Sequence, residues 1–338
     1  MFTQRSGIMK KFVNDPQNVV AEEVAGLEAL YPHSLRKIER TGIIVRKEAP
    51  VMGKVALVSG GGSGHEPLHS GYVGKGMLDA AVSGAVFTSP TPDQILTAIS
   101  TVSGGKGVLL VIKNYSGDVM NFKLAEQLAT ASGIEVAQVI VNDDVAIRAP
   151  ENRRGVAGTI LVHKIAGAKA ETGTSLDEVK RLAERVISNV GSMGVALSSC
   201  TNPAVGKPIF SLGEREMEIG IGIHGEAGVE RLDLQSADRV AELLYRRVSR
   251  ELGLKKGEEV FLLVNGMGGT PLMELQIVSR KVCELLEADG ITRFRAMAGN
   301  FVTSLEMAGF SLSLLRVDPE MKQMLLAPQM TPAFPNLV

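Results

Sequence analysis

Four short apolar runs occur along the chain, and each leads directly into a segment rich in glycine or polar residues. They are residues 55–58 before 59–65, 108–112 before 113–118, 136–141 before 142–144, and 260–264 before 265–271. Uninterrupted apolar runs of this length are typical of strands that are buried on both faces of a sheet. We predict helices after the second and fourth runs, at about 119–131 and 272–287, and therefore an α/β fold. Ligands of such sheets bind where strands end, so we expect all four polar segments at that edge.

A longer amphipathic segment follows at residues 176–192. Its apolar side chains at positions 176, 179, 182, 183, 186 and 187 recur with the period of an α-helix, and charged residues occupy the opposite face. We place a domain boundary near its end, at 185–195. The 338 residues fit about two domains of ~150 residues. We predict two α/β domains, 9–190 and 191–338, each with a mostly parallel or mixed sheet covered by helices.

The composition excludes several classes of protein. Lys and Arg number 36 against 37 Asp and Glu, so the net charge of −1 gives no general attraction to nucleic acid. No apolar run approaches the ~20 residues of a membrane span. The two cysteines, Cys200 and Cys283, do not form a disulfide framework or a cysteine-rich zinc site, and they fit a reducing cytoplasm. The first residues lack the apolar core of a secretory signal, and we read residues 1–8 as an extension outside the fold.

Residues 220–225 match the pattern GxGxxG, but their context does not favour a dinucleotide site. The following residues, 226–231, resemble a further turn rather than the helix that would bind a pyrophosphate. No GxxxxGK[ST] phosphate loop occurs. We predict instead a strand over 217–223 with one aliphatic face and one nearly bare face that leads to His224. Bare backbone suggests close approach of a ligand, although His224 in a tight structural turn is an equal alternative.

Two further segments carry candidate chemistry. His65 ends a run of glycines whose amides suit an oxyanion or a hydroxyl-rich ligand; the alternative is a solvated histidine in a flexible turn. His69 follows four residues later, and without a third ligand we interpret it as structural and predict no metal. Asp118 stands where a turn meets a helix, so a helix N-cap is its simplest interpretation. Lys113 just before it, at the presumed ligand edge, makes a functional role worth testing.

Two polar clusters remain ambiguous. Asp143 and Asp144 could bind magnesium, but an ordinary turn at a strand end is the favoured interpretation. The segment 152–155, Asn-Arg-Arg-Gly, could bind an anion or form an ion-paired turn.

Six segments, in their order along the chain, resemble the substrate-binding K subunit family of dihydroxyacetone kinases. They are residues 60–67, 87–94, 113–118, 153–158, 220–226 and 265–272. The resemblance covers about residues 10–330. It implies two α/β domains, the first with a glycine-rich substrate loop and the second with the substrate-linking histidine, and a homodimer.

The resemblance also implies the roles of individual residues. The residue that binds the substrate covalently, as a hemiaminal, falls on His224. The second catalytic histidine falls on His65 and the catalytic aspartate on Asp118, both of which also contact the substrate. Further contacts to substrate hydroxyls fall on Gly62, Ser63, Gly64 and Lys113.

The implied activity is that of a phosphotransferase acting on dihydroxyacetone. The chain itself is expected to hold no cofactor. Members that use ATP directly have a fused helical nucleotide domain, which we do not find before the last residue, Val338. The resemblance therefore implies Mg-ADP or Mg-ATP on a separate L subunit, and a phosphocarrier M subunit driven by phosphoenolpyruvate.

Three departures from the family pattern leave the substrate open. Ala85 stands where an acidic residue is common, Ala227 replaces a proline, and the segment 147–152 is short. A four-carbon ketose such as erythrulose is therefore an alternative substrate. A second hypothesis is a non-catalytic ketone sensor that acts as a transcriptional coactivator, but retention of Asp118 and His65 favours the kinase subunit.

Overall fold

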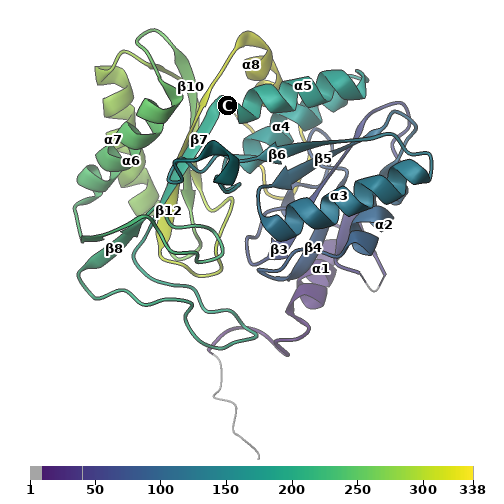
Figure 1. Ribbon diagram of the computed structural model, residues 1–338, viewed down its shortest axis with the longest axis horizontal. Helices are drawn as coiled ribbons and strands as arrows, with labels where there is room; N and C mark the ends of the chain where they lie inside the picture. Colours follow the sequence, from purple (N-terminus) through teal and green to yellow (C-terminus); the bar gives the residue numbers. More distant parts are fainter. Residues whose placement is uncertain (1–9, 40, 338) are drawn as a thin grey trace, which may run out of the picture.

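The computed structural model describes residues 10–39 and 41–337, so the expectation about residues 1–8 lies outside the described residues. Two six-stranded sheets organise the chain (Figure 1). The first has the strand order β1-β2-β4-β3-β5-β6 and the second the order β11-β10-β12-β7-β8-β9. The α/β fold class that the apolar pattern predicts is confirmed.

The first sheet is mixed. Its strands are β1 (Leu35–Ile38), β2 (Ile43–Arg46), β3 (Ala56–Ser63), β4 (Ala80–Val86), β5 (Val108–Lys113) and β6 (Val136–Val141). β4, β3, β5 and β6 are parallel neighbours, whereas β2 and β1 add an antiparallel edge. The helices of this half are α1 (Val19–Leu30), α2 (Pro92–Val102), α3 (Ser116–Ala131), α4 (Thr159–Ala170) and α5 (Leu176–Ile187).

The second sheet is mostly antiparallel, and only β10 and β11 run parallel. Its strands are β7 (Val190–Ala196), β8 (Glu216–Ile219), β9 (Glu230–Asp233), β10 (Glu259–Gly266), β11 (Thr292–Gly299) and β12 (Gly309–Arg316). Its helices are α6 (Ala237–Leu252), α7 (Leu272–Ala288) and α8 (Pro319–Leu326). Short 3-10 turns at Ser70–Tyr72 and Pro150–Asn152 complete the described elements.

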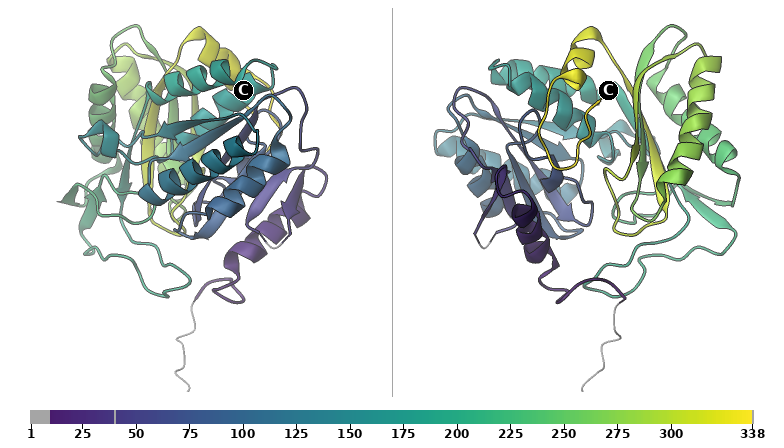
Figure 2. Two further views of the ribbon diagram at one scale, coloured as in Figure 1. Left: turned by 45° about the vertical axis from the view of Figure 1, so that its right-hand side comes forward. Right: turned by 180° about the vertical axis from the view of Figure 1, so that it is seen from behind.

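The sheets share one central core. α4 is apolar on nearly all sides and almost completely buried, and its apolar side chains belong to one cluster with Leu57 of the first sheet and Leu263 of the second. α2 and α3 cover the outer face of the first sheet, and α6 and α7 cover that of the second. α8 returns to pack against α4 (Figure 2). The limits 9–190 and 191–338 of two domains therefore stay a prediction.

Three predicted boundaries are wrong for identifiable reasons. The glycine run after residue 58 is not a turn, because β3 continues through Ser63 and pairs with β4. The helix predicted over 176–192 ends at Ile187, and β7 begins at Val190. The strand predicted over 217–223 ends at Ile219, because Gly220 has a φ of +75° that turns the backbone out of the extended region. Residues 217–223 are all buried, so the side that carries Gly220 and Gly222 is covered by the protein.

Two helices begin with the capping pattern visible in the sequence. Thr91 and Gln94 form a reciprocal capping box at the start of α2, where Pro92 also occupies the first turn. Ser175 and Glu178 form the same motif at the start of α5. These local signals fix where each helix begins before any tertiary contact is considered.

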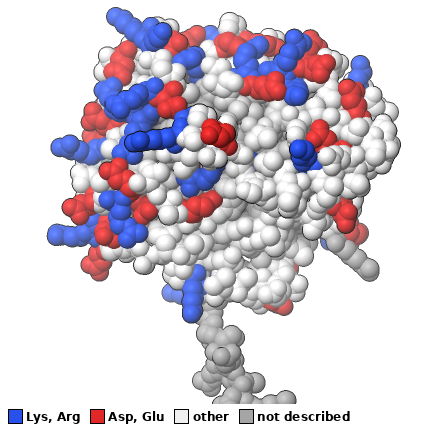
Figure 3. Space-filling model, in the orientation of Figure 1, with Lys and Arg blue, Asp and Glu red and all other residues white. Residues whose placement is uncertain are grey.

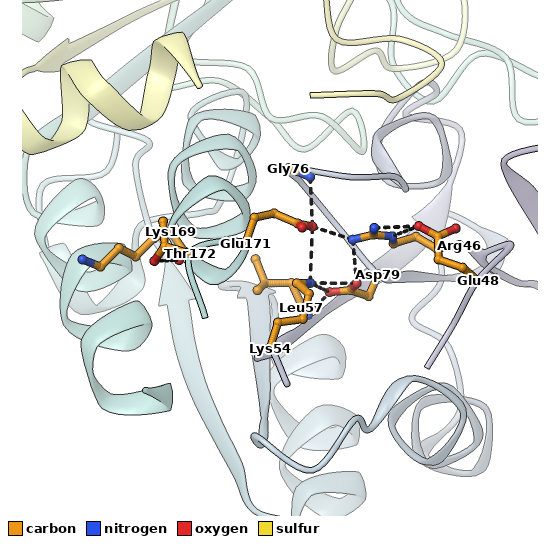
Figure 4. A network of polar contacts seen from close by, with 9 residues as sticks. All are labelled: Arg46, Glu48, Lys54, Leu57, Gly76, Asp79, Lys169, Glu171 and Thr172. Atoms are coloured by element: carbon orange, nitrogen blue, oxygen red, sulfur yellow. Dashed lines mark hydrogen bonds and ion pairs between the residues drawn. The ribbon is translucent and has the colours of Figure 1, made fainter. Parts of the chain in front are cut away.

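A buried network of ion pairs joins the first sheet to α4 (Figure 4). Asp79 accepts from Lys54 Nζ at 2.6 Å, from Arg46 at 3.2 Å and from the backbone N–H of Leu57 at 2.8 Å. Glu171, which follows α4, accepts from Arg46 at 2.5 Å and from the N–H of Gly76 at 3.2 Å. Each buried cation therefore has an anion beside it, which is the condition for burying charge at all.

The surface agrees with the charge balance of the sequence. On the face in Figure 3, Lys and Arg side chains are intermingled with Asp and Glu, and no patch of one sign covers it. No helix of residues 10–39 or 41–337 has the length and apolar character needed to cross a bilayer.

Candidate active site

The candidate residues converge where the two sheets meet. β3 ends at Ser63 and leads to His65, and β5 ends at Lys113 just before α3. The loop after β8 brings His224 from the second sheet. Backbone hydrogen bonds join the halves at this point: Thr303 N–H donates to the carbonyl of His65 at 3.1 Å, and Leu305 N–H donates to that of Gly64 at 2.8 Å. Of the four predicted polar segments, the first is largely the last part of β3 itself, and the second and third follow the ends of β5 and β6. The fourth follows the end of β10 in the second sheet rather than lying at the same edge.

His65 is a buried, neutral imidazole with a defined tautomer. Its Nδ1 lies 2.9 Å from the carbonyl oxygen of Thr303, and because a carbonyl only accepts, Nδ1 carries the proton. Nε2 is therefore a free acceptor, and it has no hydrogen-bond partner among residues 10–39 and 41–337. Burial holds the pKa of His65 well below its usual value, and positive charge at His224 or Lys113 lowers it further. The solvated alternative for this histidine is wrong, because its exposure is 0%.

His224 lies beside His65 with its rings in an edge-on arrangement, 4.5 Å between centroids. Its Nδ1 is 3.1 Å from Glu226 Oε1, and because a carboxylate oxygen only accepts, Nδ1 carries a proton; in the neutral ring the lone pair is then on Nε2. The rings of Tyr115, at 4.4 Å, and Phe87, at 5.5 Å, also meet it edge-on. Its side chain keeps 17% exposure, so of the two histidines His224 is the one that solvent reaches.

Lys113 and Asp118 form the second half of the site. Lys113 Nζ is completely buried, 3.5 Å from Asp118 Oδ2 and 2.9 Å from His69 Nε2. Burial lowers the pKa of Lys113, and the neighbouring Asp118 opposes that shift. Ser89 donates to the other oxygen of Asp118. Asp118 is not an N-cap: Tyr115 holds that position, and Asp118 lies inside the first turn of α3 with no capping hydrogen bond.

His69 has the structural role that its spacing indicates. Ser59 Oγ donates to the carbonyl of Val111 at 2.6 Å, so it accepts from His69 Nδ1 at 3.1 Å. This leaves His69 Nε2 as the acceptor for the Lys113 ammonium. His69 thus holds the lysine in place as a neutral base, and no group of three or more metal-ligating side chains occurs in the described part of the chain.

The glycines of β3 do not form a flexible turn; they allow neighbouring groups of the protein to pack close against the strand. A Cβ at Gly61 would lie 2.3 Å from Lys113 Nζ, and one at Gly62 would lie 2.5 Å from the backbone nitrogen of Thr88. Ser63 donates to the carbonyl of Gly84 at 2.7 Å, and Gly64 N–H donates to Glu66. Contacts of Gly62, Ser63 and Gly64 to a substrate stay a prediction.

The two ambiguous clusters are structural. Asp143 accepts from the backbone N–H groups of Val156 and Gly158, which confirms the turn at the end of β6. Asp144 and Arg154 form an ion pair of 2.6 Å, and Arg154 also donates to the carbonyl of Gly220 at 2.7 Å. This pair anchors the loop that carries His224.

Sequence reasoning missed five residues that shape the site: Phe87, Ser89, Tyr115, Glu226 and Thr303. Glu226 had a signal, since it lies two residues after His224 in a motif that we had singled out. Thr303, which sets the tautomer of His65, had none, because it is 238 residues away along the chain.

Two histidines, His65 and His224, thus lie together where the two sheets meet, and the buried Lys113–Asp118 pair ends the neighbouring strand β5 and begins α3. The Dak1 domain profile matches residues 25–333, and the chain belongs to this family.

Relatives and solved structures agree with this assignment. The PTS-dependent dihydroxyacetone kinase 1, dihydroxyacetone-binding subunit DhaK, of Listeria innocua is 52% identical over 315 residues, which are 92% of this chain and 95% of the relative. The structure of a dihydroxyacetone kinase operon co-activator superposes with a TM-score of 0.88 at 40% identity, covering 92% of this chain and 97% of that one. The dihydroxyacetone kinase of C. freundii in complex with AMP-PNP and Mg²⁺ gives a TM-score of 0.90 at 38% identity, and the match covers 98% of this chain but 62% of that one.

Proposed function

We propose that this chain is the substrate-binding subunit of a dihydroxyacetone kinase. It binds dihydroxyacetone as a hemiaminal on His224 and presents a hydroxyl of the bound ketone for phosphorylation. The observation that supports this best is His224, whose Nδ1 is hydrogen-bonded to Glu226 so that Nε2 is the nitrogen available to a ketone, next to the free acceptor Nε2 of His65. The names of the relatives, which are kinases and dihydroxyacetone-binding subunits, support the substrate.

The chemistry of an imidazole suits this role. Nε2 adds to the ketone carbon, and because the bonded nitrogen has no hydrogen to lose, the adduct does not dehydrate to an imine. The tether holds the terminal hydroxyl in place and so lowers the entropic cost of the next step. It also selects for a carbonyl, since a simple polyol such as glycerol offers no electrophile to His224.

The remaining residues complete the reaction. Asp118 is placed as the general base for the attacking hydroxyl, and Lys113 beside it compensates the charge. His65 Nε2 accepts a hydrogen bond from the hydroxyl of the hemiaminal. Gly62 and Ser63 end β3 and Gly64 follows them, just before His65, and these three residues contact the remaining terminal hydroxyl in the proposed complex. Phosphoryl transfer otherwise needs positioning and charge neutralisation, which the donor side supplies.

The phosphoryl donor belongs to a partner. No phosphate loop occurs in the sequence, and the C. freundii kinase that was solved with AMP-PNP and Mg²⁺ is longer than the part this chain matches. We propose a separate L subunit that binds Mg-ADP or Mg-ATP and is recharged through a phosphocarrier M subunit from phosphoenolpyruvate. In support, the relatives matched over 95% and 99% of their length are named as subunits of PTS- and PEP-dependent kinases. A homodimer in the cytoplasm completes the proposal.

A second candidate is a ketone sensor that activates transcription, because one similar structure is that of an operon co-activator. Both functions use His224, so adduct formation does not separate them. The buried pair of Lys113 and Asp118, held by His69 and Ser89, favours the kinase, since a sensor has no need of a general base. Ala85 and Ala227 leave a four-carbon ketose as an alternative substrate for either.

The decisive experiment mixes the purified chain with an L subunit, its phosphoryl donor, and either dihydroxyacetone or erythrulose. Formation of ketose phosphate supports the kinase, and the faster ketose identifies the substrate. Ketone labelled with carbon-13 at the carbonyl reports the adduct, because addition converts that carbon from a ketone to a tetrahedral centre. An adduct that persists in His224→Ala would refute the proposed nucleophile, and an adduct without turnover with any such partner would favour the sensor.

A further inference from the structure

We propose that Glu226 is the positioning residue that makes His224 a nucleophile. This inference rests on the proposed function, because it concerns the same histidine. Glu226 follows His224 by two residues, and both of its carboxylate oxygens are used on that one residue. Oε1 accepts from the ring Nδ1–H at 3.1 Å, and Oε2 accepts from the backbone N–H of His224 at 2.9 Å.

Double attachment of this kind fixes two properties of the ring. The hydrogen bond to Nδ1 holds the proton on that nitrogen, so the lone pair is on Nε2. The second bond fixes the carboxylate to the backbone of the same residue, so the ring does not rotate away without breaking the first. Tyr115 and Phe87 meet the ring edge-on at 4.4 and 5.5 Å and limit its remaining freedom.

The chain makes room for this carboxylate at Gly222. A Cβ there would lie 2.1 Å from Glu226 Oε2 and 2.7 Å from an Arg154 guanidinium nitrogen, so any larger residue would displace one or both. This explains Gly222, one of the bare positions before His224 that we had attributed to an approaching ligand. The space that the glycine leaves is occupied by the carboxylate that orients the histidine.

His224 and, to a smaller extent, Arg154 keep Glu226 ionised. Burial alone would raise the pKa of Glu226, but the hydrogen bond from His224 and the nearby guanidinium of Arg154 outweigh it, and the pKa lies below its ordinary value. Arg154 is itself held by Asp144 at 2.6 Å and by the carbonyl of Gly220. The carboxylate is therefore charged and in place before any ligand arrives.

The charge is needed when the bond to the ketone forms. The lone pair of Nε2 makes the new bond to carbon, the π electrons of the carbonyl move to its oxygen, and that oxygen takes a proton from water. The ring is then cationic, and Glu226 stabilises it at Nδ1. The Nδ1 proton then passes through Glu226 to the hydroxide that the water has become, and the ring is neutral again. The net change is a proton moved from Nδ1 to the ketone oxygen.

The test compares Glu226→Gln with Glu218→Gln. The first variant keeps the shape of the side chain but loses its charge and leaves an NH₂ facing one of the two donors. The matched control alters a carboxylate of the neighbouring strand, which accepts from Gly228 and Arg231 and does not contact His224. Urea unfolding checks that both variants fold. The rate of adduct formation with carbonyl-labelled dihydroxyacetone is measured, and nitrogen-15 NMR of the His224 ring reports its tautomer.

We expect Glu226→Gln to slow adduct formation by about 10²-fold, the lower end of what a general acid–base partner contributes, and to lose the single Nδ1–H tautomer. We expect Glu218→Gln to stay within about twofold of the wild type, since it removes no contact to His224. The inference is overturned if Glu226→Gln reacts at the wild-type rate, or if both variants slow equally, because the effect would then belong to the loop. If the wild type forms no adduct, the proposed function fails, and the tautomer in Glu226→Gln still decides the inference: an unchanged tautomer overturns it.

Discussion

The substitution Gly61→Ala tests whether the position of Lys113 controls phosphoryl transfer. Gly61 does not have a positive φ, so alanine is acceptable to the backbone and the effect is steric. The new Cβ would lie 2.3 Å from Lys113 Nζ, whereas ordinary contact begins at 3.4 Å, so the ammonium has to retreat by 3.4 − 2.3 = 1.1 Å. A shift of that size breaks at least one of its bonds to His69, Gly60 and Asp118. One hydrogen bond to a charged group is worth about 1.5–3 kcal/mol, which corresponds to about a 10- to 100-fold loss of turnover.

The assay measures ketose phosphate formed with the L subunit and its donor, and in parallel the carbon-13 signal of the adduct. We expect turnover to fall and adduct formation to persist, because the added methyl does not meet His224. Gly26→Ala in α1, where nothing lies within 4 Å of the new Cβ, is the matched control and should retain full turnover. Wild-type turnover in Gly61→Ala would refute the role given to Lys113, and loss of both readouts would show that the two halves of the site are not separable.

Three further substitutions test the buried charges. Asp79→Asn leaves Lys54 and Arg46 short of an anion and should lower the free energy of unfolding in urea by about 3–5 kcal/mol; a loss below about 1 kcal/mol would contradict this. Burial lowers the pKa of His163 from 6.5 to about 3. Between these two pH values the unfolded chain binds a proton at this residue and the folded chain does not. The free energy of unfolding therefore falls with the pH, by on the order of 5 kcal/mol in total. His163→Leu should therefore resist acid better, and an unchanged acid midpoint would refute the explanation. Burial also lowers the pKa of Lys164 to about 8 from 10.5, so this residue makes the wild type more stable as the pH rises between those values. Lys164→Met should lack that rise. Parallel curves of unfolding free energy against pH for the variant and the wild type would argue against this explanation.

The fold class could be predicted because apolar runs and helical periodicity are local properties. The strands that follow this pattern, such as β6 at Val136–Val141, coincide with their predicted bounds. The errors arose where glycine was interpreted without its neighbours. The run after residue 58 is extended because β4 pairs with it, whereas Gly220 ends a strand by its positive φ, and no local rule separates the two cases.

The candidate site could be predicted only in part. Resemblance to the family placed His65, Asp118 and His224 in one site, and the structure brings all three into one region. Their environment depends on contacts distant in sequence, such as Thr303 with His65, and those contacts set which nitrogen is free. The Asp144–Arg154 pair was visible as two charged clusters, but its use became apparent only when the loop that it holds was seen to carry His224.

The two groups proposed to react come from different halves of the molecule: His224, the proposed covalent anchor, from a loop of the second sheet, and Asp118, the proposed base, from α3 beside the first sheet. A ketone bonded to the first and hydrogen-bonded to the second would cross-link the halves of the molecule. A bound ketone should then make it harder for the two halves to separate. Protease cleavage of the connecting loops would slow in proportion to the fraction of chains that carry the adduct. Resistance to digestion would thus report substrate capture without any phosphoryl donor.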